Sequence, residues 1–294
     1  MKKNSKIGFI LCGLLAVALV LTAGCTGGGG GDAQPTEQKS ITIGYVLWDS
    51  EIASTNVVKQ VFEKAGYDVT ITAVDAAPLY QAIVSGDVDC TVSAWLPRTQ
   101  KAYMDEYGDQ LDFVGKNLEG AKIGLVVPTY VTIDSIEEMN EVKDKFDGKI
   151  VGIDAGAGVV NNAEDAIEEY GLDYDLVYSS SAGMAASLKK AVDRAEWIVV
   201  TGWTPHWKFS RWDLKYLEDP KGVFGGEEYL GTLARPGLAE DDPEAYAILE
   251  RFYWTPEDME SVMLDIEDGM SHEDAAKKWI DAHPDQVNAW LGKA

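Results

Sequence analysis

The chain has 294 residues, of which 46% are hydrophobic and 25% are charged, enough apolar material for one large domain or two moderate ones. Its formal net charge of −24 argues against the basic patches that nucleic-acid binding requires. We therefore expect a well-solvated acidic surface and no nucleic-acid partner.

The N-terminus has the composition of a secretory signal. Three lysines precede an apolar run at 7–22, and the small residues Ala23 and Gly24 precede Cys25. The ending TAGC resembles a lipobox, which predicts a signal peptide at 1–24 and lipidation of Cys25. A plain signal peptide or an uncleaved anchor is the alternative.

Residues 25–40 are predicted to be the lipidated cysteine and a flexible tether, because they contain the run TGGGGGDAQ. An acyl anchor and a loose tether predict a domain held on the extracellular face of the cell membrane. Cys12 falls in the signal, so Cys90 is the one cysteine left for the folded domain and no disulfide is expected there. Its apolar surroundings indicate a buried small side chain.

The first half of the folded region has the pattern of a parallel sheet with crossover helices. Strand-like and helix-like segments alternate as β, α, β, α, β, at 41–48, 53–66, 67–74, 79–87 and 88–95. This order is the repeating unit of α/β proteins.

The same order recurs further along the chain, at 149–158, 160–171, 174–180, 182–194 and 197–203. An offset of 108 residues aligns Gly44 with Gly152, Trp95 with Trp203, and Pro97 with Pro205. These shared landmarks predict two related lobes.

Two apolar segments, 122–128 and 229–235, are predicted to cross between the lobes, and the helical tail at 243–294 is predicted to pack on the first lobe. The expected fold is α/β and two-lobed, each lobe a mostly parallel sheet flanked by helices. The expected boundaries are lobe one at 41–124, lobe two at 125–230, and a return to lobe one at 231–294.

Three tryptophans are predicted to end equivalent strands at the edge of the cleft, namely Trp48, Trp95 and Trp203. Indole faces carry negative π density and attract cations. A quaternary ammonium has no N–H to donate, so a box of indoles suits it. Four other tryptophans are expected in the core and two in lobe-two packing: Trp197, Trp254, Trp279 and Trp290, then Trp207 and Trp212.

The loop at 154–160, DAGAGVV, corresponds to Trp48 in the other lobe. Glycines before a helix allow close approach of the backbone and leave amide N–H groups for an anion such as a carboxylate. A simple tight turn at Gly156 and Gly158 is the alternative. A cation site and an anion site in one cleft together predict a small zwitterion as the ligand.

Four segments resemble the glycine betaine-binding proteins of ABC transporters, the OpuAC-type family: GYVLWDSEIASTNVV at 44–58, SAWLPRTQKAY at 93–103, DAGAGVV at 154–160, and VTGWTPHWKFSRWDLKYLEDPK at 200–221. The resemblance covers the chain from about residue 41 to 294. It implies a type II periplasmic-binding-protein-like fold and hinge closure around the ligand.

In that family three tryptophans cage the trimethylammonium group, and they match Trp48, Trp95 and Trp203. Two adjacent backbone amides that hold the carboxylate match Gly158 and Val159. The family motif has a carboxylate-binding histidine where this chain has Gln100, which can donate a hydrogen bond but brings no charge. His206, in WTPHW, is a candidate direct ligand or a structural partner of its turn.

The sequence thus predicts a monomeric, lipid-anchored protein that delivers glycine betaine to an ABC permease, with no cofactor, metal or catalysis. Proline betaine, choline, carnitine or a sulfonium analogue are alternative ligands. An enzyme would need a nucleophile–base pair or a metal motif, and none appears in the sequence. A solute sensor without transport is the other alternative.

Overall fold

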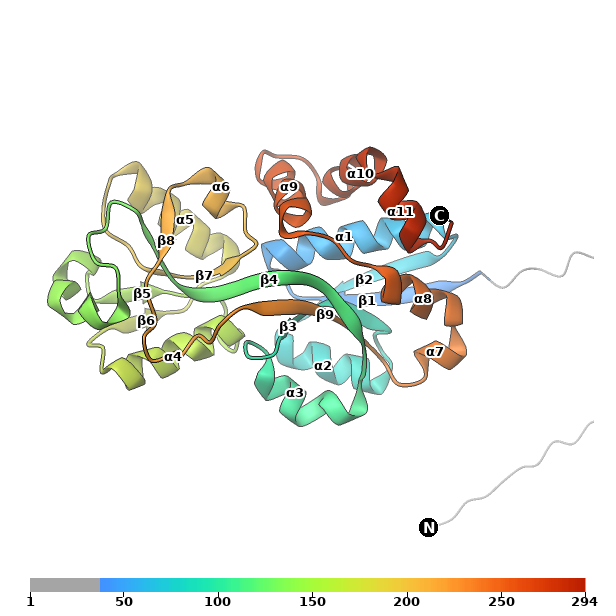
Figure 1. The fold of residues 1–294 in the computed structure, drawn as a ribbon, viewed down its shortest axis with the longest axis horizontal. Coiled ribbons are helices and arrows are strands. Elements are labelled where there is room, and N and C mark those ends of the chain that lie inside the picture. Colours follow the sequence, from blue (N-terminus) through green and yellow to red (C-terminus); the bar gives the residue numbers. More distant parts are fainter. Residues whose placement is uncertain (1–37, 294) are drawn as a thin grey trace, which may run out of the picture. The chain divides into compact units, whose positions relative to one another are not determined.

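A computed structural model describes residues 38–293, which form two lobes joined by long strands (Figure 1). The predicted signal peptide, the tether up to residue 37 and the lipidation site Cys25 lie outside the described residues. Within the described part, no helix has the length and apolar character needed to cross a membrane.

Lobe one contains the first predicted βαβαβ unit. Its strands are β1 (Ser40–Tyr45), β2 (Asp68–Ala73) and β3 (Cys90–Leu96), which pair in parallel in the order β2-β1-β3. Helices α1 (Asp49–Lys64) and α2 (Ala76–Ser85) connect them. The order agrees with the sequence prediction, but β1 ends at Tyr45, three residues before the predicted end at Trp48.

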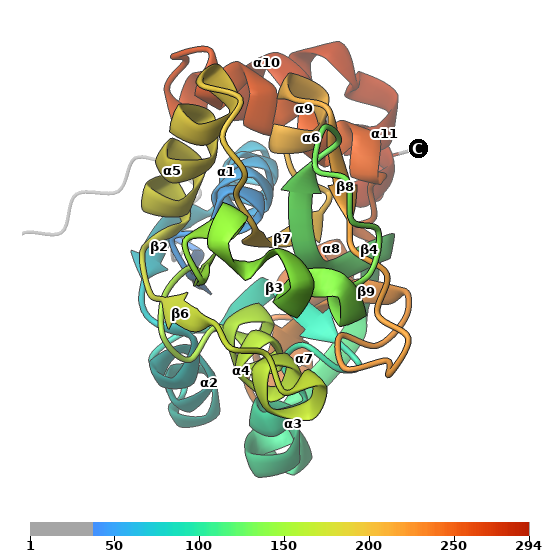
Figure 2. The same cartoon turned by 90° about the vertical axis from the view of Figure 1, so that its left-hand side faces the viewer.

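Lobe two repeats this topology. Strands β5 (Lys149–Val151), β6 (Asp175–Val177) and β7 (Val200–Thr204) pair in parallel in the order β6-β5-β7, linked by α4 (Gly158–Tyr170) and α5 (Ser181–Asp193). The two helices lie on opposite sides of these strands (Figure 2). β5 and β6 are shorter than predicted because the chain turns away from the sheet immediately after each of them.

A single long strand joins the two sheets. β4 (Asp112–Pro128) pairs antiparallel with β9 (Glu228–Ala234) through its first part, and with β7 and β8 (Leu214–Tyr216) through its last part. β9 also pairs with β3. The predicted crossing at 122–128 is therefore the lobe-two end of β4. The predicted crossing at 229–235 is β9, which lies in the sheet of lobe one.

The C-terminal tail packs on lobe one, as predicted, where α9 and α10 contact α1. Thr255 accepts from the Asp258 amide and Asp258 bonds back to Thr255, a capping box that begins α9, with proline at its first turn. The tail helices are α8 (Pro243–Arg251), α9 (Pro256–Glu267), α10 (His272–Ala282) and α11 (Pro284–Trp290). The remaining helical segments are α3 (Lys101–Tyr107), η1 (Gly108–Gln110), η2 (Ile136–Phe146), α6 (Lys208–Arg211) and α7 (Leu238–Asp241).

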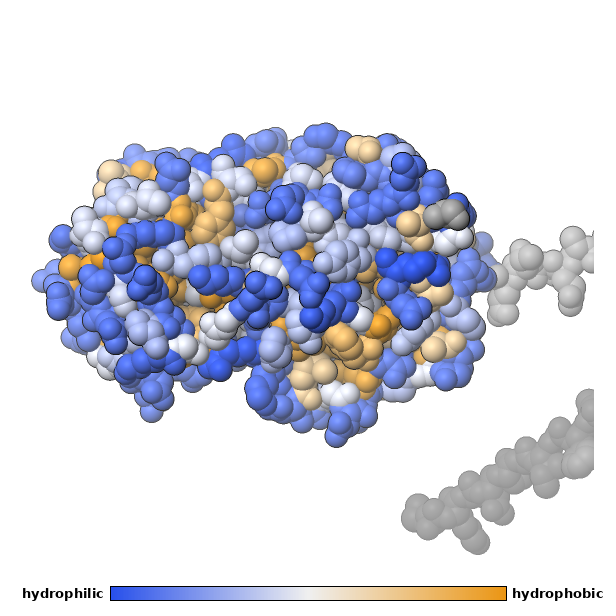
Figure 3. Space-filling view, viewed as in Figure 1, coloured by the Kyte–Doolittle hydropathy of each residue, from blue (hydrophilic) through white to orange (hydrophobic). Residues whose placement is uncertain are grey.

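Tryptophans fill the core beneath this tail. Trp254 is fully buried and packs edge-on against Trp279, which stacks on Trp290. The core positions predicted for these three are confirmed, whereas Trp197 is only half-buried and packs edge-on against the buried Phe146. Cys90 is buried as predicted, and burial raises the pKa of its thiol. Hydrophilic residues cover most of the face shown in Figure 3, with apolar residues in small scattered groups.

Replacement of Trp254 by alanine should destabilise the protein by about 3–5 kcal/mol, because it empties a large volume in a packed core. Urea unfolding followed by far-UV circular dichroism measures the effect. Tyr253→Ala is the matched control, since the neighbouring Tyr253 is 43% exposed and should contribute less than about 1 kcal/mol. Equal losses in both variants would contradict this account of the core.

Candidate functional site

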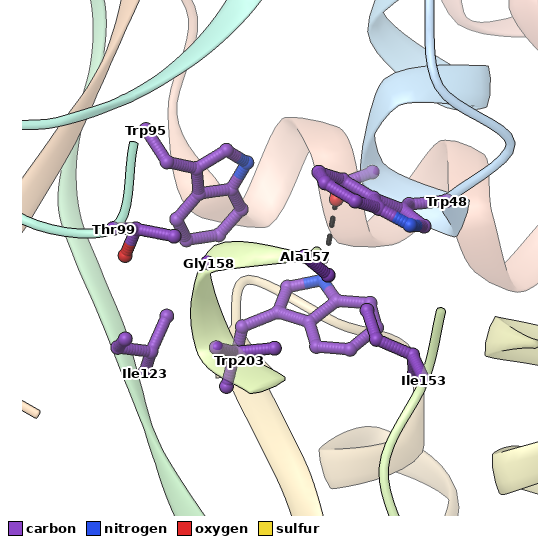
Figure 4. A pocket seen from close by; sticks show the side chains of 10 residues that line it. Trp48, Trp95, Thr99, Ile123, Ile153, Ala157, Gly158 and Trp203 are labelled. Carbon is purple, nitrogen blue, oxygen red and sulfur yellow. Dashed lines mark hydrogen bonds between the residues drawn. The ribbon is translucent and has the colours of Figure 1, made fainter. Parts of the chain in front are cut away.

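The three predicted tryptophans surround one space between the lobes (Figure 4). Trp95 lies near the end of β3 and Trp203 near the end of β7, as expected. Trp48 is not on a strand: it is the N-cap residue of α1, and its amide donates to Val46 O at 2.8 Å. This turn after β1 brings the indole to the cleft.

The pocket has about 280 Å³ of space not filled by protein atoms, part of it open to solvent. The side chains that line it are apolar except for Ser50 and Thr99, and they come from both lobes. The lining residues are Trp48, Ser50, Trp95, Thr99, Ile123, Ile153, Ala157, Gly158, Val159 and Trp203. A small apolar space with indole walls suits a ligand group that is bulky, weakly hydrated and without N–H donors.

Each of the three indole N–H groups has an acceptor. Trp48 Nε1 donates to Asp154 Oδ2 at 3.2 Å and Trp203 Nε1 donates to Ser50 Oγ at 3.2 Å, and both bonds join the two lobes. Trp95 Nε1 donates to Glu51 Oε1 at 2.7 Å within lobe one. Because every ring is held at its polar edge, its orientation is fixed and its face stays available.

Glu51 is the most unusual acidic residue of the site, because its side chain is buried beside the cage. It accepts from Trp95 and also from Ser50 Oγ at 2.8 Å. Burial raises the pKa of Glu51 to about 7, although these two donors oppose the shift. The hydrogen bonds thus run from Trp203 through Ser50 and Glu51 to Trp95.

Asp49 makes a second connection between the lobes. Its carboxylate accepts from Trp207 Nε1 at 2.9 Å and from Ser181 Oγ at 2.5 Å, both in lobe two. Burial alone would raise the pKa of Asp49, but the adjacent His206 and these two donors hold it below its ordinary value. The lobe-two position expected for Trp207 is thus also a contact with lobe one.

His206 lies behind Trp203 and does not line the pocket. It is fully buried, its ring centroid is 4.7 Å from that of Trp203, and its Nδ1 accepts from the amide of Lys208 at 3.1 Å. Burial lowers the pKa of His206 to about 4, so the ring is neutral near pH 7. This geometry matches a structural partner of the turn, and direct ligand contact stays a prediction.

Lys208 is also buried behind Trp203. Its Nζ lies 4.2 Å from the ring centroid and donates to Trp203 O at 3.5 Å. Burial lowers the pKa of Lys208 well below its usual value. The indole of Trp203 therefore has the pocket on one side and a buried amine close to its ring.

Helix α4 begins at the pocket, with Ala157 as an N-cap that has no side-chain acceptor. Within residues 38–293, the amides of Gly158 and Val159 have no hydrogen-bond acceptor, as expected for the first turn of a helix. A Cβ atom on Gly158 would lie 2.6 Å from Thr99 Cγ2 and closer still to the Thr99 carbonyl oxygen. Glycine is therefore required where this loop of lobe two meets lobe one.

Gln100 is buried beside the cage and is not among the lining residues. Its Oε1 accepts from the amide of Trp95 at 3.0 Å and from Tyr80 OH at 2.8 Å. The side chain thus holds the backbone that carries Trp95. A bond from Gln100 to a ligand carboxylate stays a prediction.

Sequence reasoning did not identify several residues that the structure brings to the site. Thr99, Ile123 and Ile153 line the pocket, and Glu51 and Asp154 hold two of its indoles. The run WDSE in the sequence places Glu51 near Trp48. Only the fold shows that the Glu51 carboxylate, on α1, reaches Trp95 on β3. Ile123 carried no signal, because an apolar residue in a strand is normally core.

Residues 39–282 match the family described as the substrate-binding domain of ABC-type glycine betaine transport systems, OpuAC. The chain belongs to the OpuAC family. A curated relative, the glycine betaine/carnitine transport binding protein GbuC of Listeria monocytogenes, is 47% identical over 162 residues. That alignment covers 54% of this chain and 54% of GbuC, about half of the relative's length.

Solved structures of the OpuAC kind match over nearly their whole length. A lactococcal OpuAC in a closed conformation with glycine betaine is 45% identical, with a TM-score of 0.83 over 86% of this chain and 99% of that chain. The glycine betaine/L-proline-binding protein ProX of Borrelia burgdorferi is 42% identical, with a TM-score of 0.83 over 86% and 96%. A choline-binding protein with choline is 26% identical, with a TM-score of 0.81 over 88% and 93%. These matches confirm the predicted type II binding-protein fold.

Substitution of Glu51 by glutamine should change how stability depends on pH. Between pH 4.5 and about pH 7, the unfolded chain releases the Glu51 proton while the folded protein retains it. The wild type should therefore lose stability relative to Glu51→Gln as pH rises through this window, by on the order of 3 kcal/mol in total.

Urea unfolding of both proteins between about pH 5 and pH 8 measures the difference. Glu63→Gln is the matched control, because Glu63 is on the same helix with a side chain that is 41% exposed. Parallel stability curves for wild type and Glu51→Gln would show that the carboxyl is not perturbed by burial.

Proposed function

We propose that this protein is an extracytoplasmic substrate-binding protein that captures glycine betaine, or a related quaternary-ammonium solute, and delivers it to an ABC permease. The observation that carries the proposal is the convergence of three indoles from both lobes on one small pocket. Beside it lie the amides of Gly158 and Val159, which have no acceptor among residues 38–293. Membership of the OpuAC family supports it.

The cationic end of the ligand is assigned to the indoles of Trp48, Trp95 and Trp203. A trimethylammonium group spreads its charge over methyl groups and cannot donate a hydrogen bond, so ring faces replace its hydration. Each cation–π contact contributes about 0.5–1 kcal/mol when wet and roughly 2 kcal/mol or more when desolvated. The fixed ring orientations reduce the entropy lost on binding.

The carboxylate end is assigned to the first turn of α4. The amides of Gly158 and Val159 would donate to it, and the positive end of the helix dipole favours the negative charge. Gln100 and His206, the two further residues that the sequence indicated, would act here through the residues they hold. A hydrogen bond from the Gln100 side chain to the ligand carboxylate is also expected. Binding of glycine betaine and its analogues to a Gln100→Ala variant would test it.

We propose that the two lobes close around the ligand by a hinge motion. The hinge is formed by strand β4 and by the segment that enters β9. Trp48 and Trp95 belong to lobe one, while Trp203 and the α4 loop belong to lobe two, so the ligand contacts complete only when the lobes meet. Tyr103 OH donates to Gly156 O at 2.9 Å, a further bond across the cleft. The ligand is released unchanged, without chemistry or a cofactor.

The pocket's size favours a compact solute. Indoles from both lobes line the pocket closely, and an indole cage distinguishes charge and girth better than chain length. Proline betaine, choline, carnitine and sulfonium analogues remain the alternative ligands, and a sensor without transport remains the alternative role. Choline lacks a carboxylate. Competition between choline and glycine betaine therefore measures how much the proposed carboxylate site at α4 contributes to affinity.

The cellular setting is part of the proposal. The signal at 1–24, lipidation at Cys25 and the tether to residue 40 would hold a monomer at the extracellular face of the membrane near its permease. The support is the TAGC sequence and the binding-protein fold. Mass spectrometry of the N-terminal peptide from the membrane fraction tests the lipidation.

Trp203→Ala should abolish most binding, because it removes an aromatic wall that lobe two contributes. We expect the Kd for glycine betaine to rise at least about 100-fold, equivalent to roughly 2.7 kcal/mol. Isothermal titration calorimetry measures it.

Trp197→Ala is the control for Trp203→Ala, since Trp197 is on lobe two and does not line the pocket. An unchanged Kd in Trp203→Ala would remove the cage assignment. Absence of binding by the wild-type protein to glycine betaine and the alternative solutes would remove the function itself.

Gly158→Ala should prevent full closure, because the added methyl group meets the backbone of Thr99. We expect at least about tenfold weaker glycine betaine binding. We also expect loss of the decrease in radius of gyration that small-angle X-ray scattering should show when the wild type binds ligand.

Gly226→Ala is the control for Gly158→Ala, because a Cβ atom at Gly226 meets nothing within 4 Å. Normal compaction of the Gly158→Ala variant would show that lobe two does not approach Thr99 in the bound state.

A further inference from the structure

We propose that Glu51 is the positioning residue and the countercharge of the aromatic cage, and that it makes the pocket select a cation over a neutral group of the same shape. This inference rests on the proposed function, because it concerns how the same pocket treats the ligand's cationic end. Glu51 would not touch the ligand and would act through Trp95 and, by way of Ser50, through Trp203.

The geometry gives Glu51 control of two of the three cage walls. One carboxylate oxygen accepts from Trp95 Nε1 at 2.7 Å, and the other accepts from Ser50 Oγ at 2.8 Å. Ser50 in turn accepts from Trp203 Nε1 at 3.2 Å across the cleft. Both carboxylate oxygens accept hydrogen bonds from cage residues, and Glu51 is 1% exposed, so the cage residues fix the position of its side chain.

A neutral acceptor would orient Trp95 equally well, so the choice of a carboxylate needs a reason. An indole whose N–H donates to an anion becomes more electron-rich, because hydrogen bonds to charged groups polarise their donors. Its face then attracts a cation more strongly. The carboxylate is also buried and bonded to two residues that line the pocket, so its attraction to a cation there is poorly screened.

Other charged groups also surround the cage. Asp154 accepts from Trp48, and Asp49 lies on the same helix as Glu51 and accepts from Trp207. The positive candidates are His206 and Lys208, whose ring centroid and Nζ lie 4.7 Å and 4.2 Å from the Trp203 ring centroid. A further acidic residue, Glu260 on α9, accepts from Ser210 Oγ at 3.5 Å. Three carboxylates therefore accept from indole N–H groups around the pocket, those of Glu51, Asp154 and Asp49.

Burial disfavours the charged form of Glu51, although two hydrogen bonds hold its carboxylate. Since burial raises the pKa of Glu51 to about 7, part of the ligand-free protein is protonated near neutral pH. A cation in the cage stabilises the charged form and lowers this pKa. Binding should therefore release protons from Glu51, and the binding affinity should include this coupling.

The test compares two ligands that differ in charge alone. Glycine betaine carries a trimethylammonium group, whereas 3,3-dimethylbutanoate carries a neutral tert-butyl group of nearly the same shape on the same carboxylate arm. Glu51→Gln keeps the side-chain shape and an acceptor for Trp95. At about pH 8 it should weaken glycine betaine binding roughly tenfold and change 3,3-dimethylbutanoate binding less than about twofold.

The second readout is proton release, measured by calorimetry at about pH 7 in buffers of different ionisation enthalpy. The wild type should release protons on binding glycine betaine, and Glu51→Gln should release fewer. Proton exchange by Asp49, His206 and Lys208 is common to both proteins, so the difference between the proteins reports on Glu51. Ser54→Ala is the matched control, because Ser54 Oγ bonds the backbone oxygen of Glu51 at 3.3 Å and leaves the carboxylate untouched. It should match the wild type in both readouts.

The outcomes separate this inference from the proposed function. Glycine betaine binding by the wild type upholds the function, and its absence overturns both. Equal weakening of both ligands in Glu51→Gln, with proton release unchanged, assigns Glu51 a purely structural role and overturns the inference. Unchanged affinity of Glu51→Gln for glycine betaine also overturns it. If 3,3-dimethylbutanoate binds neither protein, the affinity for glycine betaine and the proton release decide.

Discussion

The arrangement of the site depends on where the indole N–H groups point. An indole has one polar atom, and in a buried place that atom needs an acceptor. Here each acceptor lies at the edge of the pocket: Asp154 for Trp48, Glu51 for Trp95 and Ser50 for Trp203. Two of these bonds cross the cleft, so the interactions that aim the ring faces also hold the lobes together. The bonds of Trp203, Ser50, Glu51 and Trp95 form one continuous series, and the bond between Trp48 and Asp154 crosses the cleft separately.

The internal repeat explains how one chain builds complementary walls. Each lobe has a central strand followed by a helix whose N-terminus reaches the cleft, α1 in lobe one and α4 in lobe two. In lobe one Trp48 occupies the N-cap position of this helix, and its indole lines the pocket. In lobe two the equivalent loop is reduced to small residues, so that the amides of α4 are exposed to the pocket. The same topology therefore places an indole at the cleft in lobe one and the first amides of a helix there in lobe two.

Much of this could be predicted from the sequence, because it depends on periodic patterns and local motifs. Helix and strand order follow from hydrophobic spacing, and the offset of 108 residues placed Trp95 and Trp203 at equivalent positions. The strand end at Trp48 was wrong because a tight turn after Tyr45 looks like a continued apolar strand. The roles of Glu51, Asp154 and Thr99 depend on contacts between distant segments, and residue types alone do not reveal them. Gln100 and His206 were recognised as special, but the structure shows what the sequence could not, that both lie behind the pocket wall.

The acidic surface has a consequence for how this domain meets other charged surfaces. A protein with a formal net charge of −24 is repelled by anionic lipid headgroups over a distance set by the surrounding electrolyte. That distance falls from roughly 30 Å at 0.01 M ionic strength to about 8 Å at 0.15 M. Concentrated electrolyte therefore lets the domain come nearer to a bilayer than dilute medium does.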